Sequence, residues 1–467
     1  MLSKLLRKKS SSDPCADTGL RKCLSAFDLT MLGIGAIIGT GIFVLTGIAA
    51  ATQAGPAVVL SFVVAGVACT FAALAYAELA SSVGGCGSAY GYSYAAFGEF
   101  IAWIIGWDLL LEYAVATAAV ANGWSGYFKD ALTAMGIGLP DMLTKGPAMG
   151  GFVNLPAMGI ILALTAILVV GVKQSARFND AVVFIKLLTI GVFIAVAIFH
   201  INPGNWADFM PFGWFSHLPD GKTVGVLAGA SLVFFAYIGF DAVSTAVEEA
   251  KDPQKDIPIG ILASLGICTI VYIVVSGLLT LIVPYTELNV SSPVAHALRQ
   301  VGVSWASGLV AAGVIGGLTT VMLVLFYGLT RIILAMSRDG LLPPIFSKIC
   351  DKTKTPAQTT MICGVLMAVT AGFIPLGVLA ELVNIGTLFA FVVVCIGVIV
   401  LRRAQPDLKR PFKMPFGIVL PVMGALSCLA LIAFLPMVTI LRFVVWLAVG
   451  MVIYFAYSLH HSKLAKG

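Results

Sequence analysis

Ionisable side chains stand inside long apolar stretches of this sequence. Asp108 and Glu112, in the segment WDLLLEY, are four residues apart and therefore share one face of a helix. Lys186 is the only ionisable residue in the apolar run 181–199, and Asp241 ends the segment FFAYIGFD. A charge inside an apolar span is costly, so these residues predict ion or proton chemistry, unless they only satisfy neighbouring helices.

A second unusual feature is the glycine-rich segment 33–43, GIGAIIGTGIF. Gly35 and Gly39 have the GxxxG spacing that lets helices pack closely in lipid. Packing leaves Gly41 unexplained, and the run Gly39-Thr40-Gly41 has the low helix propensity of a helix break. A break frees backbone groups, which must then be satisfied by protein, water or a ligand.

Motifs for covalent or metal chemistry are absent from the sequence. There is no nucleophile elbow, phosphate loop or zinc motif, and the five histidines lack metal-ligand spacing. The nine cysteines, an odd number, lie mostly in apolar stretches and predict no disulfide framework. We therefore expect neither enzyme activity nor a metal or organic cofactor.

The elements that position these residues are transmembrane helices. Of the 467 residues, 59% are hydrophobic and only 11% are charged, a composition that no water-soluble domain needs. A helix that spans a bilayer takes about 20 apolar residues. The sequence predicts an all-α integral membrane protein with twelve spans, near 24–50, 57–80, 100–126, 155–174, 179–200, 223–248, 259–284, 305–335, 360–375, 378–401, 417–435 and 438–459.

Basic residues predict the orientation, because Lys and Arg gather in cytoplasmic loops. The N-terminal tail carries Lys4, Arg7, Lys8, Lys9, Arg21 and Lys22. With this tail inside, most of the 28 basic residues fall on the cytoplasmic side. We expect a multi-pass protein of the cell membrane with both termini cytoplasmic, and the net charge of +6 does not indicate a nucleic-acid partner.

The first and sixth spans hold equivalent positions in two halves of five spans each. An odd number of spans inserts the second half upside down, and corresponding interruptions in inverted halves indicate a binding site near the membrane midplane. The predicted divisions are the N-terminal tail 1–22, the halves 23–200 and 223–402, the last two spans 411–460 and the C-terminal tail 461–467.

Three segments resemble the amino acid-polyamine-organocation superfamily: IIGTGIF in the first span, FFAYIGFDAVSTAVEEAKDPQKDIPIGI at 234–261 and RIILAMSRDGLLP at 331–343. Within it, they are similar to the cationic amino acid transporter branch and its bacterial relatives. The resemblance implies a LeuT-type fold, two inverted five-helix repeats plus two extra C-terminal helices. It also implies L-amino acid substrates, alternating access and coupling to protons rather than sodium.

The resemblance assigns roles to the backbone of the first break. The free amides of Thr40 and Gly41, with Ile42 adjoining, would receive the substrate carboxylate, because a half-helix N-terminus suits an anion. The carbonyl of Ile37, at the end of the preceding half-helix, would face the substrate amine.

In the sixth span, the carbonyls of Phe235, Ala236 and Ile238 would contact the same amine. The Phe235 ring would be an aromatic gate over the substrate, with ordinary helix packing as the alternative. Asp241 would stand in the first turn of the second half-helix, where a carboxylate compensates the helix dipole, or it would line a pocket or proton path.

Lys186 matches a fifth-span lysine of proton-coupled relatives, whose ammonium replaces the sodium ion held between the first and fifth spans. Alternatively, Lys186 snorkels to the membrane interface. An ammonium buried against first-span carbonyls could lose and regain its proton, because burial disfavours the charged form. Glu112 is the other candidate for a proton or substrate contact.

Tyr113, Met322 and Phe326 are candidates for an apolar side-chain pocket. Because the interrupted segments offer no carboxylate besides Asp241, we expect small neutral L-amino acids such as alanine. Glu112 leaves open a uniporter or exchanger of arginine and lysine. A channel or a receptor without transport belongs to another class, and the sequence lacks the repeated ring of charges or carbonyls that a channel filter needs.

Overall fold

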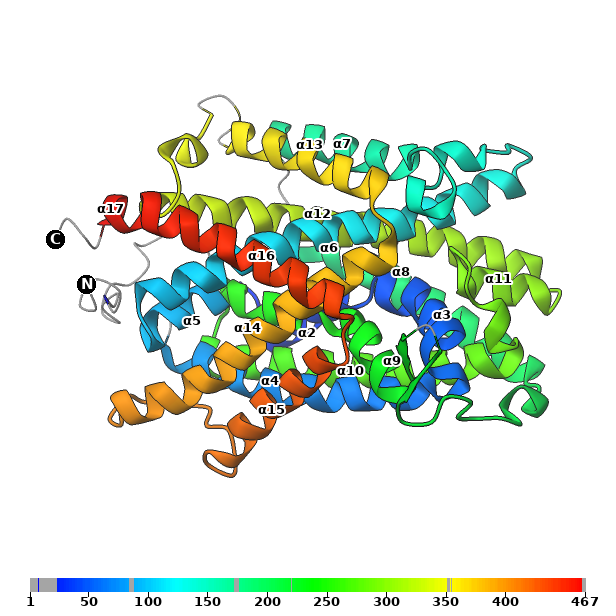
Figure 1. The fold of residues 1–467 in the computed structure, drawn as a ribbon, viewed down its shortest axis with the longest axis horizontal. Helices are drawn as coiled ribbons and strands as arrows, with labels where there is room; N and C mark the ends of the chain where they lie inside the picture. The colour runs from blue at the N-terminus through cyan, green and yellow to red at the C-terminus, as the bar shows by residue number, and fades with distance from the viewer. Residues whose placement is uncertain are drawn as a thin grey trace.

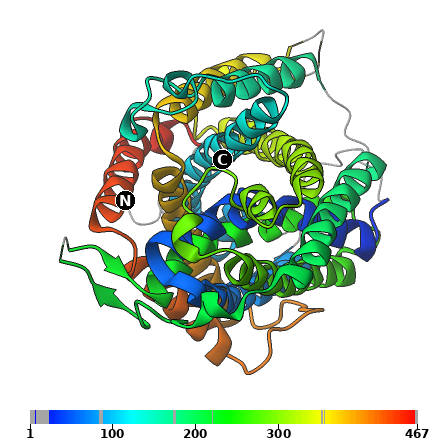
Figure 2. The ribbon, with the colours of Figure 1, turned by 90° about the vertical axis from the view of Figure 1, so that its right-hand side faces the viewer.

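The computed structural model describes residue 7 and residues 23–83, 88–171, 176–219, 221–350, 353 and 355–463, without the side chains of 176–178 and 248. This part of the chain is mostly helical, and its long helices run along one common direction (Figure 1). Figure 2 looks along that direction and shows the helices arranged around a common centre. Two short strands, β1 (Ser216–His217) and β2 (Thr223–Val224), form an antiparallel hairpin outside the bundle.

Eight helical segments of the described chain are long and apolar enough to cross a membrane: Ala26–Val83, Glu99–Ala134, Asn179–His200, Val226–Val247, Pro253–Ile282, Ser304–Arg338, Leu376–Ala404 and Met437–His461. Three shorter apolar helices are Leu155–Val170, Ala357–Phe373 and Val419–Ala433. These helices agree with the predicted helical membrane class, while the count of twelve spans stays a prediction.

The first segment is interrupted twice. Helix α2 (Ala26–Ile37) ends where Ile38 becomes extended, with φ −72° and ψ 102°. A π-helix, η1 (Gly41–Leu45), follows and continues through α3 (Thr46–Ala49) and η2 (Ala50–Ala54). The second interruption is at Gly55, whose φ of +64° suits glycine. Gly55 begins the short helix η3 (Gly55–Ala57), and α4 (Val58–Val83) follows.

The predicted sixth span is interrupted as well. Helix α9 (Val226–Val233) tightens into the 3₁₀ turn η8 (Phe234–Tyr237), and Gly239 follows with a φ of +119°. A long 3₁₀ helix, η9 (Phe240–Glu249), completes the span in place of the expected second α-helical half. Glycine is needed at position 239, because other residues rarely adopt this φ.

The other helices surround these two spans: α5 (Ala89–Ala96), α6 (Glu99–Ala134), α7 (Leu155–Val170), α8 (Ala176–Ala197), α10 (Pro253–Ile282), α11 (Pro293–Gln300), α12 (Ser304–Arg338), α13 (Ala357–Phe373), α14 (Leu376–Ala404), α15 (Val419–Ala433), α16 (Met437–Ile453) and α17 (Leu459–His461). Short 3₁₀ or π turns are η4 (Asp141–Leu143), η5 (Pro147–Met149), η6 (Ile198–His200), η7 (Pro203–Trp206), η10 (Tyr285–Glu287), η11 (Pro344–Ser347) and η12 (Tyr454–Ser458). Helix α10 begins six residues before the predicted start at 259, because Pro253 suits the first turn of a helix.

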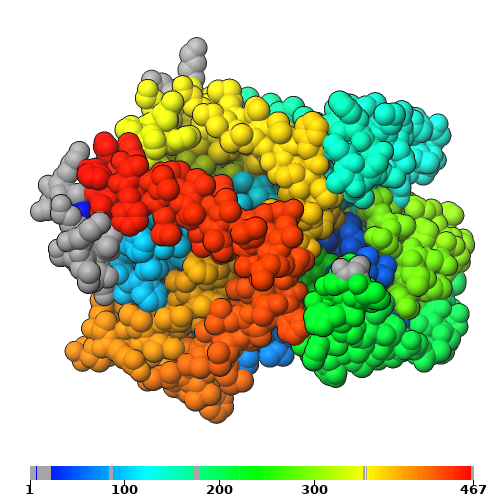
Figure 3. All heavy atoms as spheres, viewed as in Figure 1, coloured from blue at the N-terminus to red at the C-terminus, as the bar shows by residue number. Residues whose placement is uncertain are grey.

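Helix packing surrounds the interrupted segments with long straight helices. Helix α2 contacts α8 and α10, α4 contacts α9 and α10, and α6 contacts both α12 and α14. Helices α7 and α13 pair at one side of the bundle, and α16 runs across the face seen in Figure 3. The interrupted segments are therefore enclosed by protein.

A buried ion pair ties α4 to α14 at one end of the bundle. Glu78 is only 2% exposed, and its carboxylate accepts hydrogen bonds from Arg402 at 2.8 and 2.5 Å. It also accepts the backbone N–H of Met414 at 2.7 Å, and Arg410 lies 3.8 Å away. The carboxylate thus holds the connection between α14 and α15 against α4.

We expect Glu78→Ala to destabilise the protein, because Arg402 loses its carboxylate partner in a largely buried place. Removing one partner of a buried pair costs about 3–5 kcal/mol. The measurement is the apparent melting temperature of the purified protein in detergent. The control is Asp141→Ala, because exposed ion pairs contribute little. Hydrogen bonds from Lys129 and Lys145 lower the pKa of the exposed Asp141 carboxylate to about 2. An unchanged melting temperature for Glu78→Ala would contradict the role given to this pair.

Candidate functional site

The two interrupted spans cross, and at each crossing a glycine of one lies against an alanine of the other. A Cβ added to Gly41 would lie 2.2 Å from the Cα of Ala236. A Cβ added to Gly239 would lie 2.9 Å from the carbonyl carbon of Ala36. Neither position has room for a side chain, so the two backbones touch directly.

The GxxxG pair of the first span does not act as one packing face. A Cβ on Gly35 would lie 2.7 Å from Cγ2 of Val183 in α8, a close helix contact. The nearest atom to a Cβ on Gly39 is 3.7 Å away, on Val321, which is an ordinary distance. Close packing therefore explains Gly35, whereas Gly39 belongs to the break.

The first break presents backbone amides to the interior. Thr40 and Ile42 are buried at the start of the half-helix, where the first N–H groups have no preceding carbonyl of their own helix. Within the described chain, the hydroxyl of Thr40 is buried and has no hydrogen-bond partner. Tyr127 of α6 donates to the carbonyl of Phe43 at 2.8 Å and holds the half-helix in place. The free N–H groups and the Thr40 hydroxyl together suit a carboxylate.

The two breaks also direct carbonyls toward one point. The hydroxyl of Tyr272, on α10, lies 2.8 Å from the carbonyl oxygen of Ile37 and 2.8 Å from that of Ala236. A hydroxyl carries one proton and donates one hydrogen bond at a time, so these carbonyls share a single donor. Sequence reasoning missed Tyr272, although a tyrosine in an otherwise apolar span was a signal for it.

A cavity lies along the first break. Residues of the first and second breaks line it, together with apolar side chains of α6 and α12. The lining residues are Ala36, Ile37, Gly39, Thr40, Gly41, Ala116, Val120, Phe235, Ile238, Val321 and Leu325. We call this the break cavity, and it brings together Ile37, Thr40, Gly41, Phe235 and Ile238, five of the residues predicted for substrate binding.

The remaining predicted substrate residues adjoin this cavity. Ala236 and Ile42 are buried beside it, at 1% and 0% exposure. Phe235 belongs to η8 and is buried, and its carbonyl accepts the N–H of Ile238 at 3.3 Å. That carbonyl is therefore already engaged, whereas the Phe235 ring remains on the cavity wall.

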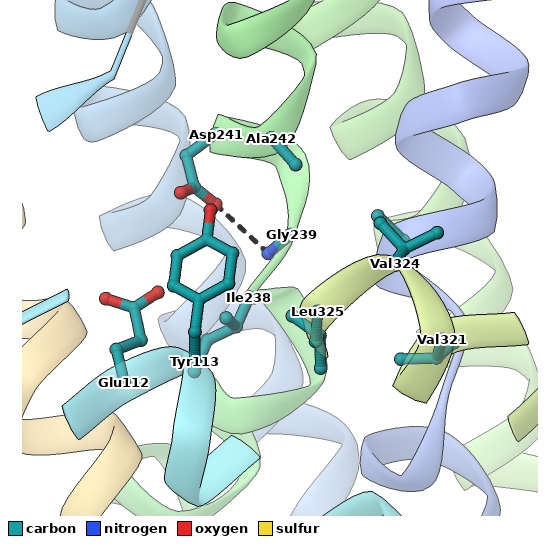
Figure 4. A pocket seen from close by; sticks show the side chains of 10 residues that line it. Glu112, Tyr113, Ile238, Gly239, Asp241, Ala242, Val321, Val324 and Leu325 are labelled. Atoms are coloured by element: carbon teal, nitrogen blue, oxygen red, sulfur yellow. Dashed lines mark hydrogen bonds between the residues drawn. The ribbon is translucent and has the colours of Figure 1, made fainter. Parts of the chain in front are cut away.

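A second cavity, the acidic cavity, shares one wall with the first. Glu112 and Tyr113 reach it from α6, and Asp241 reaches it from the start of η9. Figure 4 shows the hydroxyl end of Tyr113 directed toward the Asp241 carboxylate. An oxygen of Asp241 accepts the N–H of Gly239 at 3.2 Å, the position expected of a carboxylate at a helix N-terminus.

Helix α12 supplies the wall between the two cavities. Val321 and Leu325 line both cavities, together with Ala36 and Ile238. Figure 4 shows Val321, Leu325 and Ile238 at the acidic cavity. Met322 and Phe326, which the sequence analysis proposed for the pocket, are fully buried and line neither cavity. The difference is one of helix phase, since adjacent residues point about 100° apart around the axis.

Asp108 lies apart from both cavities. It is fully buried against α14, where a Cβ on Gly386 would lie 2.6 Å from its Oδ1. Within the described chain, neither of its carboxylate oxygens has a hydrogen-bond partner. Glu112 therefore lines a cavity and Asp108 does not, although the two share a helix face.

Lys186 is buried beside the first break. Its side chain is 1% exposed, and its ammonium donates to the carbonyl of Gly35 at 2.6 Å and to that of Ile38 at 3.2 Å. These carbonyls belong to the C-terminal end of a half-helix, which favours a cation. The side chain therefore points into the bundle rather than to a membrane interface, and its role in coupling stays a prediction.

The fold and the site define a class: a helical membrane protein whose candidate binding site is built on two interrupted helices that cross. Residues 24–457 match the family model described as amino acid permease. The chain belongs to this amino acid permease family, as the three quoted segments predicted.

Three relatives place the chain within the family. It is 51% identical over 470 residues to the methylthioribose transporter of Bacillus subtilis (strain 168), covering 100% of both chains. It is 51% identical over 473 residues to the branched-chain amino acid permease BcaP of the same organism, covering 99% of this chain and 100% of that one. It is 40% identical over 410 residues to cationic amino acid transporter 4 of Homo sapiens, covering 86% of this chain and 63% of that one. All three relatives are named as transporters or permeases.

We expect Gly41→Ala to abolish amino-acid binding, because its Cβ would collide with the backbone of Ala236 and separate the two breaks. Gly41→Leu should act in the same way. The control is Gly316→Ala in helix α12, because a Cβ at this position would meet nothing within 4 Å. The measurement is stabilisation of the purified protein against heat by added L-alanine, in variants that insert into the membrane. If L-alanine stabilises Gly41→Ala as much as the unchanged protein, Gly41 serves only in helix packing.

Proposed function

We propose that this permease takes up neutral aliphatic L-amino acids by proton symport with alternating access. The observation that carries the proposal is the lining of the break cavity, which combines residues of both breaks, Gly39 and Gly41 among them, with apolar side chains. Backbone groups of the two breaks suit the charged ends of any amino acid. Apolar walls suit a side chain without charge, from alanine to the branched-chain residues.

The proposed binding mode uses the two ends of the broken first helix. The substrate carboxylate lies on the amides of Thr40 and Gly41, at a helix N-terminus. The substrate ammonium lies on the carbonyls of Ile37 and Ala236, where it takes the place of the Tyr272 hydroxyl as donor. The side chain of the substrate then faces α12.

A LeuT-type arrangement of twelve spans is part of this proposal. Counting the segment Ala26–Val83 as two spans, because Gly55 interrupts it, and adding the three shorter apolar helices brings the eight candidates to twelve. The proposed inverted repeats are 23–200 and 223–402, followed by the pair 411–460. Both termini then lie in the cytoplasm, and the protein resides in the cell membrane.

Lys186 is the proposed proton carrier. Its ammonium contacts the carbonyl of Ile38, and the substrate ammonium is proposed to contact that of Ile37, the adjacent peptide. Two cations on neighbouring carbonyls influence each other electrostatically, and both depend on the same break. Loss of the proton from Lys186 would weaken its hydrogen bonds to the Gly35 and Ile38 carbonyls, because a neutral amine donates more weakly than an ammonium, and would allow α2 to move.

A cationic substrate is the second candidate, supported by the acidic cavity and by the relative named as a cationic amino acid transporter. The side chains of Ile238 and Leu325 lie between the two cavities. An arginine or lysine side chain would have to pass them to reach Glu112 or Asp241. The present wall therefore favours neutral substrates.

The test is uptake of labelled L-alanine, L-leucine and L-arginine into proteoliposomes, with and without an inward proton gradient. We expect gradient-driven accumulation of alanine and leucine above equilibrium, and little uptake of arginine. Equilibration without accumulation would indicate a channel or uniporter, and binding without uptake would indicate a receptor. Methylthioribose, added as a competitor, tests the substrate named for one relative.

We expect Lys186→Ala to abolish gradient-driven accumulation, because the variant has no proton carrier beside the first break. Lys186→Arg should not restore accumulation, because a guanidinium does not release its proton in proteins. Both variants are compared with the unchanged protein in the same proteoliposome assay. Full accumulation by Lys186→Arg would show that Lys186 is not the proton carrier. Glu112 and Asp241 would then be the candidates for proton coupling.

We expect Phe235→Ala to reduce uptake more than it reduces binding from the open side, because closure over the substrate needs the ring while binding uses backbone groups. Phe235→Tyr keeps the ring and serves as the control. Uptake rate and binding affinity are measured on the same preparations. Equal uptake by Phe235→Ala and the unchanged protein would leave Phe235 as a packing residue.

A further inference from the structure

The Lys186 side chain lies along a glycine of α12. A Cβ added to Gly317 would lie 3.0 Å from both Cγ and Cε of Lys186 and 3.4 Å from its Cδ. Such distances are tighter than ordinary contacts, so any side chain at position 317 would displace the lysine stem. The stem thus occupies the space that a side chain at 317 would need.

The neighbouring glycines of α12 behave differently. A Cβ on Gly313, one turn earlier, would meet Thr189 of α8, with its Oγ1 only 2.0 Å away. A Cβ on Gly316 would meet nothing within 4 Å. Gly313 and Gly317 therefore form the GxxxG groove that receives α8, and only Gly317 touches the lysine.

Three helices then surround the end of Lys186. Helix α2 supplies the carbonyls of Gly35 and Ile38, and α12 supplies Gly317. Helix α10 supplies Cys268, the titratable group that faces the ammonium within the described chain. No carboxylate of that part of the chain pairs with Lys186 within 4.0 Å, so its hydrogen-bond partners there are the two carbonyls.

We propose that Gly317 is a positioning residue, which sets where the Lys186 ammonium lies against the carbonyls of Gly35 and Ile38. The inference rests on the proposed coupling role of Lys186. An alanine at 317 moves the stem by a few tenths of an ångström, and charge-assisted hydrogen bonds weaken when their distance and angle change. The ammonium then holds its proton less firmly at a given pH.

The experiment measures the pH profile of alanine uptake for Gly317→Ala in proteoliposomes. We expect its midpoint to shift by about one pH unit toward acid, the equivalent of one weakened charge-assisted hydrogen bond. Exchange of internal for external alanine without a gradient should continue, because the break cavity is unchanged. Gly316→Ala should match the unchanged protein in both assays.

Gly313→Ala separates positioning from helix packing, because it presses on α8 at Thr189 without touching Lys186. We expect its pH midpoint to stay in place. An unshifted midpoint for Gly317→Ala, or an equal shift for Gly313→Ala, would overturn the proposal. If Gly317→Ala alone is not recovered folded, Gly317→Ala/Lys186→Ala should be, because the steric conflict is gone; loss of this double variant would also overturn it.

The coupling role and the positioning role fail in different ways. If Lys186→Ala still accumulates alanine, Lys186 has no coupling role, irrespective of the pH profile of Gly317→Ala. If Lys186→Ala loses accumulation and the pH profile of Gly317→Ala is unshifted, the coupling role of Lys186 is retained. The positioning role of Gly317 is then rejected.

Discussion

Direct contact between the backbones of the two interrupted spans is the constraint on which the site depends. Gly41 lies against Ala236, and Gly239 lies against Ala36, with no side chain between them. This closeness lets carbonyls from both spans reach a single hydroxyl, that of Tyr272. A larger residue at either glycine would separate the polar groups that must act on one ligand.

An interrupted helix in apolar surroundings leaves backbone groups that need partners, and the surrounding helices supply them. Tyr127 of α6, Lys186 of α8 and Tyr272 of α10 each donate to carbonyls of the first span. Asn384 of α14 donates to the carbonyls of Ser231 and Leu232, at 2.7 and 3.0 Å. Movement of either break would require these donors to exchange partners, which would connect the proposed substrate binding to the packing of four other helices.

In the proposed mechanism, specificity and coupling use different surfaces of the same break. The break cavity presents apolar walls from α6 and α12, and the acidic cavity stands behind Ile238 and Leu325. Lys186 approaches the first break from α8, through the carbonyls of Gly35 and Ile38. Substrate choice can therefore change through the α12 wall without altering the lysine, which fits a family whose members are named for different substrates.

The sequence alone determined the helical membrane class and the position of both interruptions, because apolar length and low glycine helix propensity are local properties. It also singled out Lys186, since a charge in an apolar run needs a reason. Only the tertiary structure decided which carbonyls Lys186 contacts, that Tyr272 bridges the breaks, and that α12 lines the cavities with Val321 and Leu325 instead of Met322 and Phe326. Those facts depend on how residues far apart in the chain pack, and an almost uniformly apolar helix carries little local signal for which of its faces looks inward.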